Sequence, residues 1–117
     1  MSSRNWQLRI QDILTAACNI REYTQELTFE QFSENKLVVK AVLYDYMIIG
    51  EASRHIPQHI QERYSEIPWR LMGDMRNVVT HEYFQVRIKL IWQGINNDLP
   101  LLIEQLEHLL AIESEAD

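Results

Sequence analysis

The stretch KLVVKAVLYDYMIIGEASRH, residues 36–55, places apolar residues on two neighbouring stripes of one helix. Residues three and four apart share a helix face, and both stripes keep that spacing. A face this broad predicts a helix that is buried on two sides. The stripes consist of Leu37, Ala41, Tyr44 and Ile48, and of Val38, Val42, Ile49 and Ala52.

Three ionisable residues lie on these stripes. Asp45 falls on the second stripe, and Glu51 and His55 continue the first. Charged side chains rarely stay buried without a partner. We therefore predict that these three residues lie at an interface or in a site.

The preceding segment is also helical in pattern. Apolar residues recur at three-four spacing from about Arg4 to Leu27, which predicts a long first helix. Thr28–Asn35 interrupts the pattern with capping-type residues, so we expect a turn or a single helical turn there. Asn35 or Ser33 is placed to cap the helix that starts near Lys36.

Prolines divide the segment that follows. Pro57 lacks a backbone N–H and is expected to end the central helix, with an irregular helix continuing to about Tyr64. Ile67-Pro68-Trp69 predicts the start of a third helix, because proline is favoured at the first helical position. Arg76 and Asn77 are expected to lie at the end of this third helix.

A last long helix is predicted after Phe84, with isoleucines and leucines at helical spacing as far as Leu109. Asn96–Pro100 predicts a kink within it. Residues 113–117, and about 1–3, are expected to fray because the pattern offers them nothing to pack against.

These segments predict an all-α fold, an up-down bundle of four to five helices in one domain spanning residues 1–117. No stretch alternates as a β-strand does, and 117 residues suit one domain. No apolar run approaches the roughly 18 residues of a membrane helix, so we expect a soluble, cytoplasmic protein without membrane contacts. Cys18 is the only cysteine, and we expect it to be a thiol in the core.

The net charge of −6 is unevenly distributed. Residues 54–89 carry a balance of +2, whereas the rest of the chain carries −8. A surplus of acid argues against non-specific coating of nucleic acid. A phosphate-bearing ligand would be steered to the basic segment.

That segment contains MRNVVTHEYF, residues 75–84, where a guanidinium, an amide, an imidazole and a phenol fall within eight residues. In a continuous helix Arg76 and His81 would point about 140° apart. We therefore expect the helix to end near Thr80, so that His81 and Tyr83 enter an extended segment that Arg76 can meet.

Arginine beside histidine suits phosphodiester chemistry. The guanidinium can donate two hydrogen bonds to two phosphate oxygens, and the imidazole can accept and donate protons near neutral pH. Cleaving RNA needs two proton carriers but each chain offers one histidine here, which suggests a shared site on a two-fold axis. No carboxylate pair for a two-metal site is evident, and no catalytic metal is expected.

Two simpler interpretations remain open at this point. Arg76, His81 and Tyr83 could form an ordinary capping and hydrogen-bonding cluster at a helix end. His55 and His59 have the spacing of a metal pair, but Pro57 between them favours solvated surface.

The residues Arg76 to Tyr83 match the Arg-x4-His-x-Tyr pattern of the HepT-like proteins, a branch of the HEPN superfamily. Further landmarks resemble that family in order and spacing from about Asp12 to Leu110. They are Ile49-Gly50-Glu51-Ala52, Ile67-Pro68-Trp69, Met75-Arg76-Asn77 and Asp98-Leu99-Pro100.

The resemblance implies a homodimer with two Arg/His stretches facing one cleft, and a metal-independent endoribonuclease that needs no cofactor. Arg76 would hold the phosphate, His81 would transfer protons and Asn77 would help to orient the site. Glu51 would lie near the cleft.

The resemblance also implies the toxin of a type VII toxin–antitoxin pair. Its antitoxin is a minimal nucleotidyltransferase, MntA, which attaches AMP to the tyrosine matching Tyr83. The alternative is a non-catalytic HEPN binding module that assembles with a nucleotidyltransferase and holds nucleotide or RNA.

Overall fold

The computed structural model describes the backbone of residues 5–80 and 84–116, and the side chains of residues 5–79 and 88–114. Within those ranges every regular element is a helix, which confirms the all-α prediction. The helices are α1 (Trp6–Thr24), α2 (Phe29–Glu34), α3 (Lys36–Ser53), α4 (Gln58–Arg63), α5 (Trp69–Thr80), α6 (Phe84–Asn97) and α7 (Leu99–Ala116).

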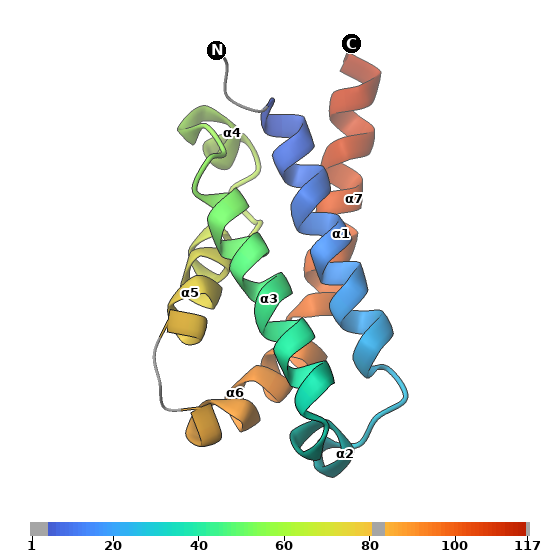
Figure 1. Ribbon diagram of the computed structural model, residues 1–117. Coiled ribbons are helices and arrows are strands. Elements are labelled where there is room, and N and C mark those ends of the chain that lie inside the picture. Colours follow the sequence, from blue (N-terminus) through green and yellow to red (C-terminus); the bar gives the residue numbers. More distant parts are fainter. Residues whose placement is uncertain (1–4, 81–83, 117) are drawn as a thin grey trace.

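Helix α3 occupies the centre of the bundle. It packs against α1 on one side and α5 on the other, and α1 in turn packs against α7 (Figure 1). Helix α6 crosses near the end of the bundle where α2 lies (Figure 1). Helix α5 contacts α3, and α6 contacts α7 and α2. The bundle therefore positions the two helices that precede and follow residues 81–83 in sequence.

Side-chain caps explain why the first helices begin where they do. The Asn5 side chain accepts a hydrogen bond from the Gln7 N–H, 2.7 Å away. Thr28 and Gln31 bond each other's backbone N–H groups and so form a capping box at α2. Asn35 accepts from the Val38 N–H at the start of α3, which confirms one of the two caps that the sequence predicted.

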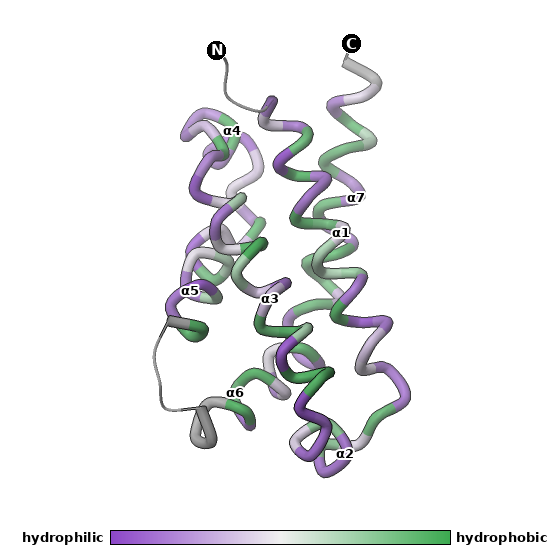
Figure 2. Tube along the Cα trace, in the orientation of Figure 1, coloured by the Kyte–Doolittle hydropathy of each residue, from purple (hydrophilic) through white to green (hydrophobic). Residues whose placement is uncertain are grey.

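Isoleucine and leucine side chains fill the core. Figure 2 shows hydrophobic positions recurring between hydrophilic ones along α1, α3 and α7. The side chains with the least exposure include Ile10, Ile13, Ile20, Phe32, Ile49, Met72, Leu102, Leu106 and Leu109. Phe32 on α2 also stacks obliquely on Trp92 of α6, with ring centroids 5.1 Å apart.

Helix α3 is buried on two sides, by α1 and by α5, as predicted, but its first apolar stripe stays largely outside the core. Val42 and Ile49 of the second stripe are fully buried. On the first stripe Leu37 is 82% exposed and Tyr44 is 68% exposed, while Ala41 and Ile48 are half-buried. The neighbouring helices cover only part of the apolar face, and an apolar strip remains on the outside of α3.

The described part of the chain contains seven helices rather than four or five, because two short helices form and the last helix is divided. Only Asp98 separates α6 from α7. The Asp98 N–H still bonds Gly94 and the Leu102 N–H bonds Asp98, but Pro100 has no N–H to continue the ladder. The predicted kink is therefore a break of one residue.

The expectation that the chain frays from Glu113 onward is wrong at Glu113 itself. Helix α7 extends to Ala116, and Glu113 accepts a hydrogen bond from the Tyr64 hydroxyl and pairs with Arg63 at 3.0 Å. The hydrogen bond from Tyr64 lowers the pKa of Glu113. The pKa of Tyr64 is raised, mainly by burial and secondly by the hydrogen bond to Glu113. These contacts attach the end of α7 to α4.

The predictions for the two prolines Pro57 and Pro68 have different outcomes. Helix α3 ends before Pro57, as expected, and Pro57 directly precedes α4. Pro68 lies just outside α5 rather than at its first position, and its carbonyl accepts a hydrogen bond from the Met72 N–H.

Cys18 is half-buried at the edge of the core. No helix among the described residues is long and apolar enough to cross a membrane.

Candidate functional site

The structure describes helix α5 as far as Thr80. The helix end that the sequence predicts near Thr80 borders residues 81–83, which lie outside the described residues. Arg76 and Asn77 lie in the last described turns of α5. Asn77 is exposed, and Arg76 is half-buried. His81 and Tyr83, the other two chemical groups of the stretch, lie outside the described residues.

The backbone of Arg76 lies directly against Gly50 of α3. A Cβ added at Gly50 would lie 2.5 Å from the Arg76 Cβ and 2.9 Å from its backbone nitrogen. Contacts this short are not tolerated, so only glycine allows α3 and α5 to approach each other here. The Gly50 carbonyl also accepts a hydrogen bond from the buried Ser53 hydroxyl, 2.8 Å away.

The next residue on α3 pairs with the Arg76 side chain. Glu51 Oε1 lies 3.0 Å from Arg76 Nε. The N–H on Nε is not aligned for a hydrogen bond to any described residue, so we describe this contact as an ion pair. Arg54 lies 3.8 Å from the same carboxylate oxygen. One acid is therefore shared by two cations, and the cluster keeps a net positive charge.

This cluster brings together two of the residues that the sequence predicts for the site. Glu51, predicted to lie near the cleft, does contact Arg76. Both side chains are partly open to solvent, at 38% for Arg76 and 49% for Glu51. Glu51 pairs with Nε of Arg76, whereas the two terminal guanidinium nitrogens are the ones that form paired hydrogen bonds to phosphate oxygens in bidentate contacts.

Asp45 and His55 do not join Arg76. Asp45 is only 4% exposed and lies on the α1 side of α3, in a hollow with Asp12, Thr15 and Asn19. Burial raises the pKa of Asp45, and a hydrogen bond with Asn19 partly opposes that shift. His55 and His59 are exposed, and the described residues include no group of three or more metal-binding side chains.

The sequence model of the family described as Ribonuclease HepT-like matches residues 13–109. The chain belongs to the HepT-like ribonucleases, within the HEPN superfamily. A protein of Methanocaldococcus jannaschii named as an RNase is 34% identical over 107 residues, which cover 92% of this chain and 98% of that protein. A protein of Thermococcus cleftensis named as ribonuclease HepT is 39% identical over 100 residues, covering 86% and 91%. No solved structure matches the chain significantly.

For this HepT-like chain, sequence reasoning used Gly50 only as a landmark and missed its structural role. A signal was present, because glycine inside a helix costs about 0.5–1 kcal/mol relative to alanine and such a residue usually has a packing reason. The pairing of Arg54 with Glu51 was also missed. Its three-residue spacing within and just beyond α3 could have indicated it.

We expect Gly50→Ala to destabilise the HepT-like chain by about 1–3 kcal/mol, because the added methyl group forces α5 away from α3. Urea unfolding followed by circular dichroism measures this change. Gly73→Ala on α5 is the matched control, since no atom lies within 4 Å of its added Cβ. That variant should gain about 0.5–1 kcal/mol. Equal stability of the two variants would show that the close approach is unimportant.

Proposed function

We propose that this chain is a metal-independent endoribonuclease that cuts RNA through Arg76 and His81, and that it acts as the toxin of a type VII toxin–antitoxin pair. The observation that carries the proposal is the placement of Arg76. Gly50 lies against its backbone and Glu51 pairs with its Nε, near the end of the described part of α5 and five residues before His81 in sequence. Membership of a ribonuclease family supports the same reaction class.

The proposed chemistry assigns one role to each group. The ribose 2′-oxygen attacks the adjacent phosphorus and loses its proton, while the bond to the 5′-oxygen breaks and that oxygen gains a proton. His81 carries protons in this exchange, and the terminal nitrogens of Arg76 stabilise the growing negative charge on the phosphate oxygens. Glu51 orients the guanidinium, and Asn77 offers an amide at the edge of the site.

A second copy of the chain would complete the centre by placing its Arg76 opposite the His81 of the first chain. The exposed apolar strip of α3, with Leu37 and Tyr44, runs along the helix towards Glu51, which pairs with Arg76. Burying this strip against the same strip of another chain would form a two-fold interface that ends beside the two Arg76 side chains. The homodimer is therefore part of the proposal.

Neutralisation is proposed to occur at Tyr83, by the nucleotidyltransferase MntA. The Tyr83 phenol oxygen would attack the α-phosphorus of ATP, losing its proton and releasing pyrophosphate. The attached AMP adds negative charge and bulk seven residues from Arg76, where RNA phosphate would otherwise bind.

We expect the chain, produced without a nucleotidyltransferase, to cut cellular RNA in the presence of EDTA. His81→Ala should reduce the cleavage rate by about 10²–10⁴-fold through loss of proton transfer. Arg76→Ala should reduce it by about 10²–10³-fold. Gel analysis of RNA fragments over time measures both effects.

His55→Ala is the control, because His55 is exposed and lies outside the Arg-x4-His-x-Tyr motif; it should cut as the wild type does. If unmodified wild-type protein, verified by intact mass, does not cut RNA, the endoribonuclease proposal fails. RNA or nucleotide binding without cutting would then support the alternative of a non-catalytic binding module.

We expect a mixture of Arg76→Ala and His81→Ala chains to regain about one quarter of wild-type activity. Random pairing makes half of the dimers mixed, and each mixed dimer holds one centre with both residues if the centre combines opposite chains. Adding Tyr44→Glu to both chains places a charge in the proposed interface and should abolish the recovery. A mixture as inactive as its components would rule out the shared centre.

We expect incubation with the nucleotidyltransferase and ATP to add one AMP to the wild-type chain and to stop its RNA cleavage. Tyr83→Phe should gain no mass and keep cutting, because it lacks the attacking oxygen. Tyr23→Phe and Tyr44→Phe remove exposed phenols elsewhere and should still be modified. Peptide mass spectrometry locates the AMP, and its attachment to another residue would refute the assignment to Tyr83.

A further inference from the structure

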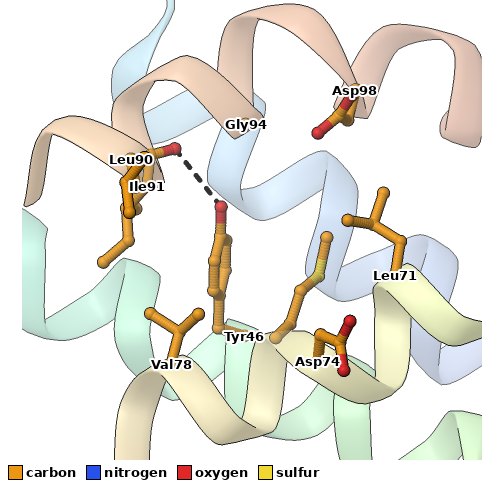
Figure 3. A pocket seen from close by; sticks show the side chains of 9 residues that line it. Tyr46, Leu71, Asp74, Val78, Leu90, Ile91, Gly94 and Asp98 are labelled. Carbon is orange, nitrogen blue, oxygen red and sulfur yellow. Dashed lines mark hydrogen bonds between the residues drawn. The ribbon is translucent and has the colours of Figure 1, made fainter. Parts of the chain in front are cut away.

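A groove runs between α5 and the junction of α6 with α7. It consists of two adjoining pockets, since Leu71 and Asp98 line both. Figure 3 shows the first pocket, with Tyr46 pointing from α3 to the backbone of α6 and Leu71 and Asp74 on the α5 side. The walls are therefore the helices that precede and follow residues 81–83.

The floor of the groove is held in place by Tyr46. Its hydroxyl donates a hydrogen bond to the Ile91 carbonyl, 3.3 Å away (Figure 3). Gly94 lies beside this hydroxyl, and a Cβ there would come within 3.3 Å of it. Burial, with the charge of Asp98 as a second cause, raises the pKa of Tyr46 well above its ordinary value, so the donor proton stays in place. The groove is thus built into the helix packing.

Within the described part of the chain, all charged residues that line the groove are acidic. Asp74, Asp98 and Glu66 contribute carboxylates, and no lysine or arginine with a described side chain is among the lining residues. Arg70 lies one helical turn before Asp74, but it is not part of the lining. This acidic lining falls within the otherwise basic segment and its C-terminal flank, and it would repel an RNA phosphate.

The walls between these acids are apolar. Leu71 and Val78 of α5 are half-buried in the groove. Leu90 on α6 is 54% exposed and Leu101 on α7 is 58% exposed, one lining each of the two pockets. Apolar walls with an acidic rim complement a helix that carries leucine-like residues on one face and lysine or arginine beside them.

We propose that this groove is a docking site for a basic amphipathic helix of a protein partner. Such a partner would contact both α5 and α6 and would lie beside the helices that flank residues 81–83. The proposal concerns a surface distinct from the Arg76–Glu51 cluster, and it does not depend on RNA cleavage or on modification of Tyr83.

The test uses the full chain and a fluorescein-labelled, 16-residue amidated peptide of leucine and lysine with leucines at helical spacing. Fluorescence anisotropy in moderate salt measures its affinity. The double variant Asp74→Asn/Asp98→Asn removes two acids from the groove, and asparagine preserves the capping ability of position 98. It should raise Kd about tenfold. Leu101→Gln should raise Kd about threefold.

Glu104→Gln/Glu107→Gln is the matched control, because it removes two exposed acids of α7 that do not line the groove. It changes the net charge by the same amount and should leave Kd unchanged. Thermal melts establish that all variants fold. If both double variants raised Kd equally, the binding would be explained by general charge attraction, and the proposal would be overturned.

The nature of the occupant is tested with two further probes. A peptide with glutamine in place of lysine should bind about tenfold more weakly to the wild-type chain, because it lacks the complementary charge. Equal binding of that peptide would overturn the proposed basic character of the partner. Competition of the leucine-lysine peptide by a 12-nucleotide RNA at the groove itself would assign the surface to RNA and equally overturn the proposal.

Discussion

The contact between Gly50 and Arg76 controls the geometry of the whole site. With hydrogen in place of a side chain, α3 and α5 approach until backbone and Cβ atoms meet. This brings Glu51, one residue further along α3, within 3.0 Å of Arg76. A partly exposed arginine on a helix is otherwise free to sample many rotamers. Here the close helix pair and one carboxylate restrict it before any ligand arrives, which lowers the entropy lost on binding.

The same central helix presents different chemistry on its different sides. Its α1 side buries Asp45 beside Asn19, and its α5 side holds Glu51 against Arg76. Its outer strip leaves Leu37 and Tyr44 in solvent. A helix of a small bundle has too few neighbours to be covered all round, so its remaining apolar strip is available for another chain. The proposed homodimer would use that strip.

Helix α5, which precedes residues 81–83 in sequence, contributes to two kinds of surface, one shared with α3 and the other with α6 and α7. One is the cationic cluster of Arg76 and Arg54 about Glu51, which suits phosphate. The other is the acidic, apolar groove with Asp74 and Asp98, which suits a basic protein segment. Opposite charges on the two surfaces would keep an RNA substrate and a protein partner apart while allowing both to lie near the same short segment.

The sequence by itself determined the all-α class, the end of α3 before Pro57, the Asn35 cap and the family, because these depend on local spacing and on motif residues. Only the tertiary structure decided the rest. It brought Glu51 rather than Asp45 to Arg76, attached Glu113 to Tyr64, and left one stripe of α3 exposed. Helical periodicity tells which residues share a face, but the neighbour that covers each face depends on contacts between residues far apart in the chain.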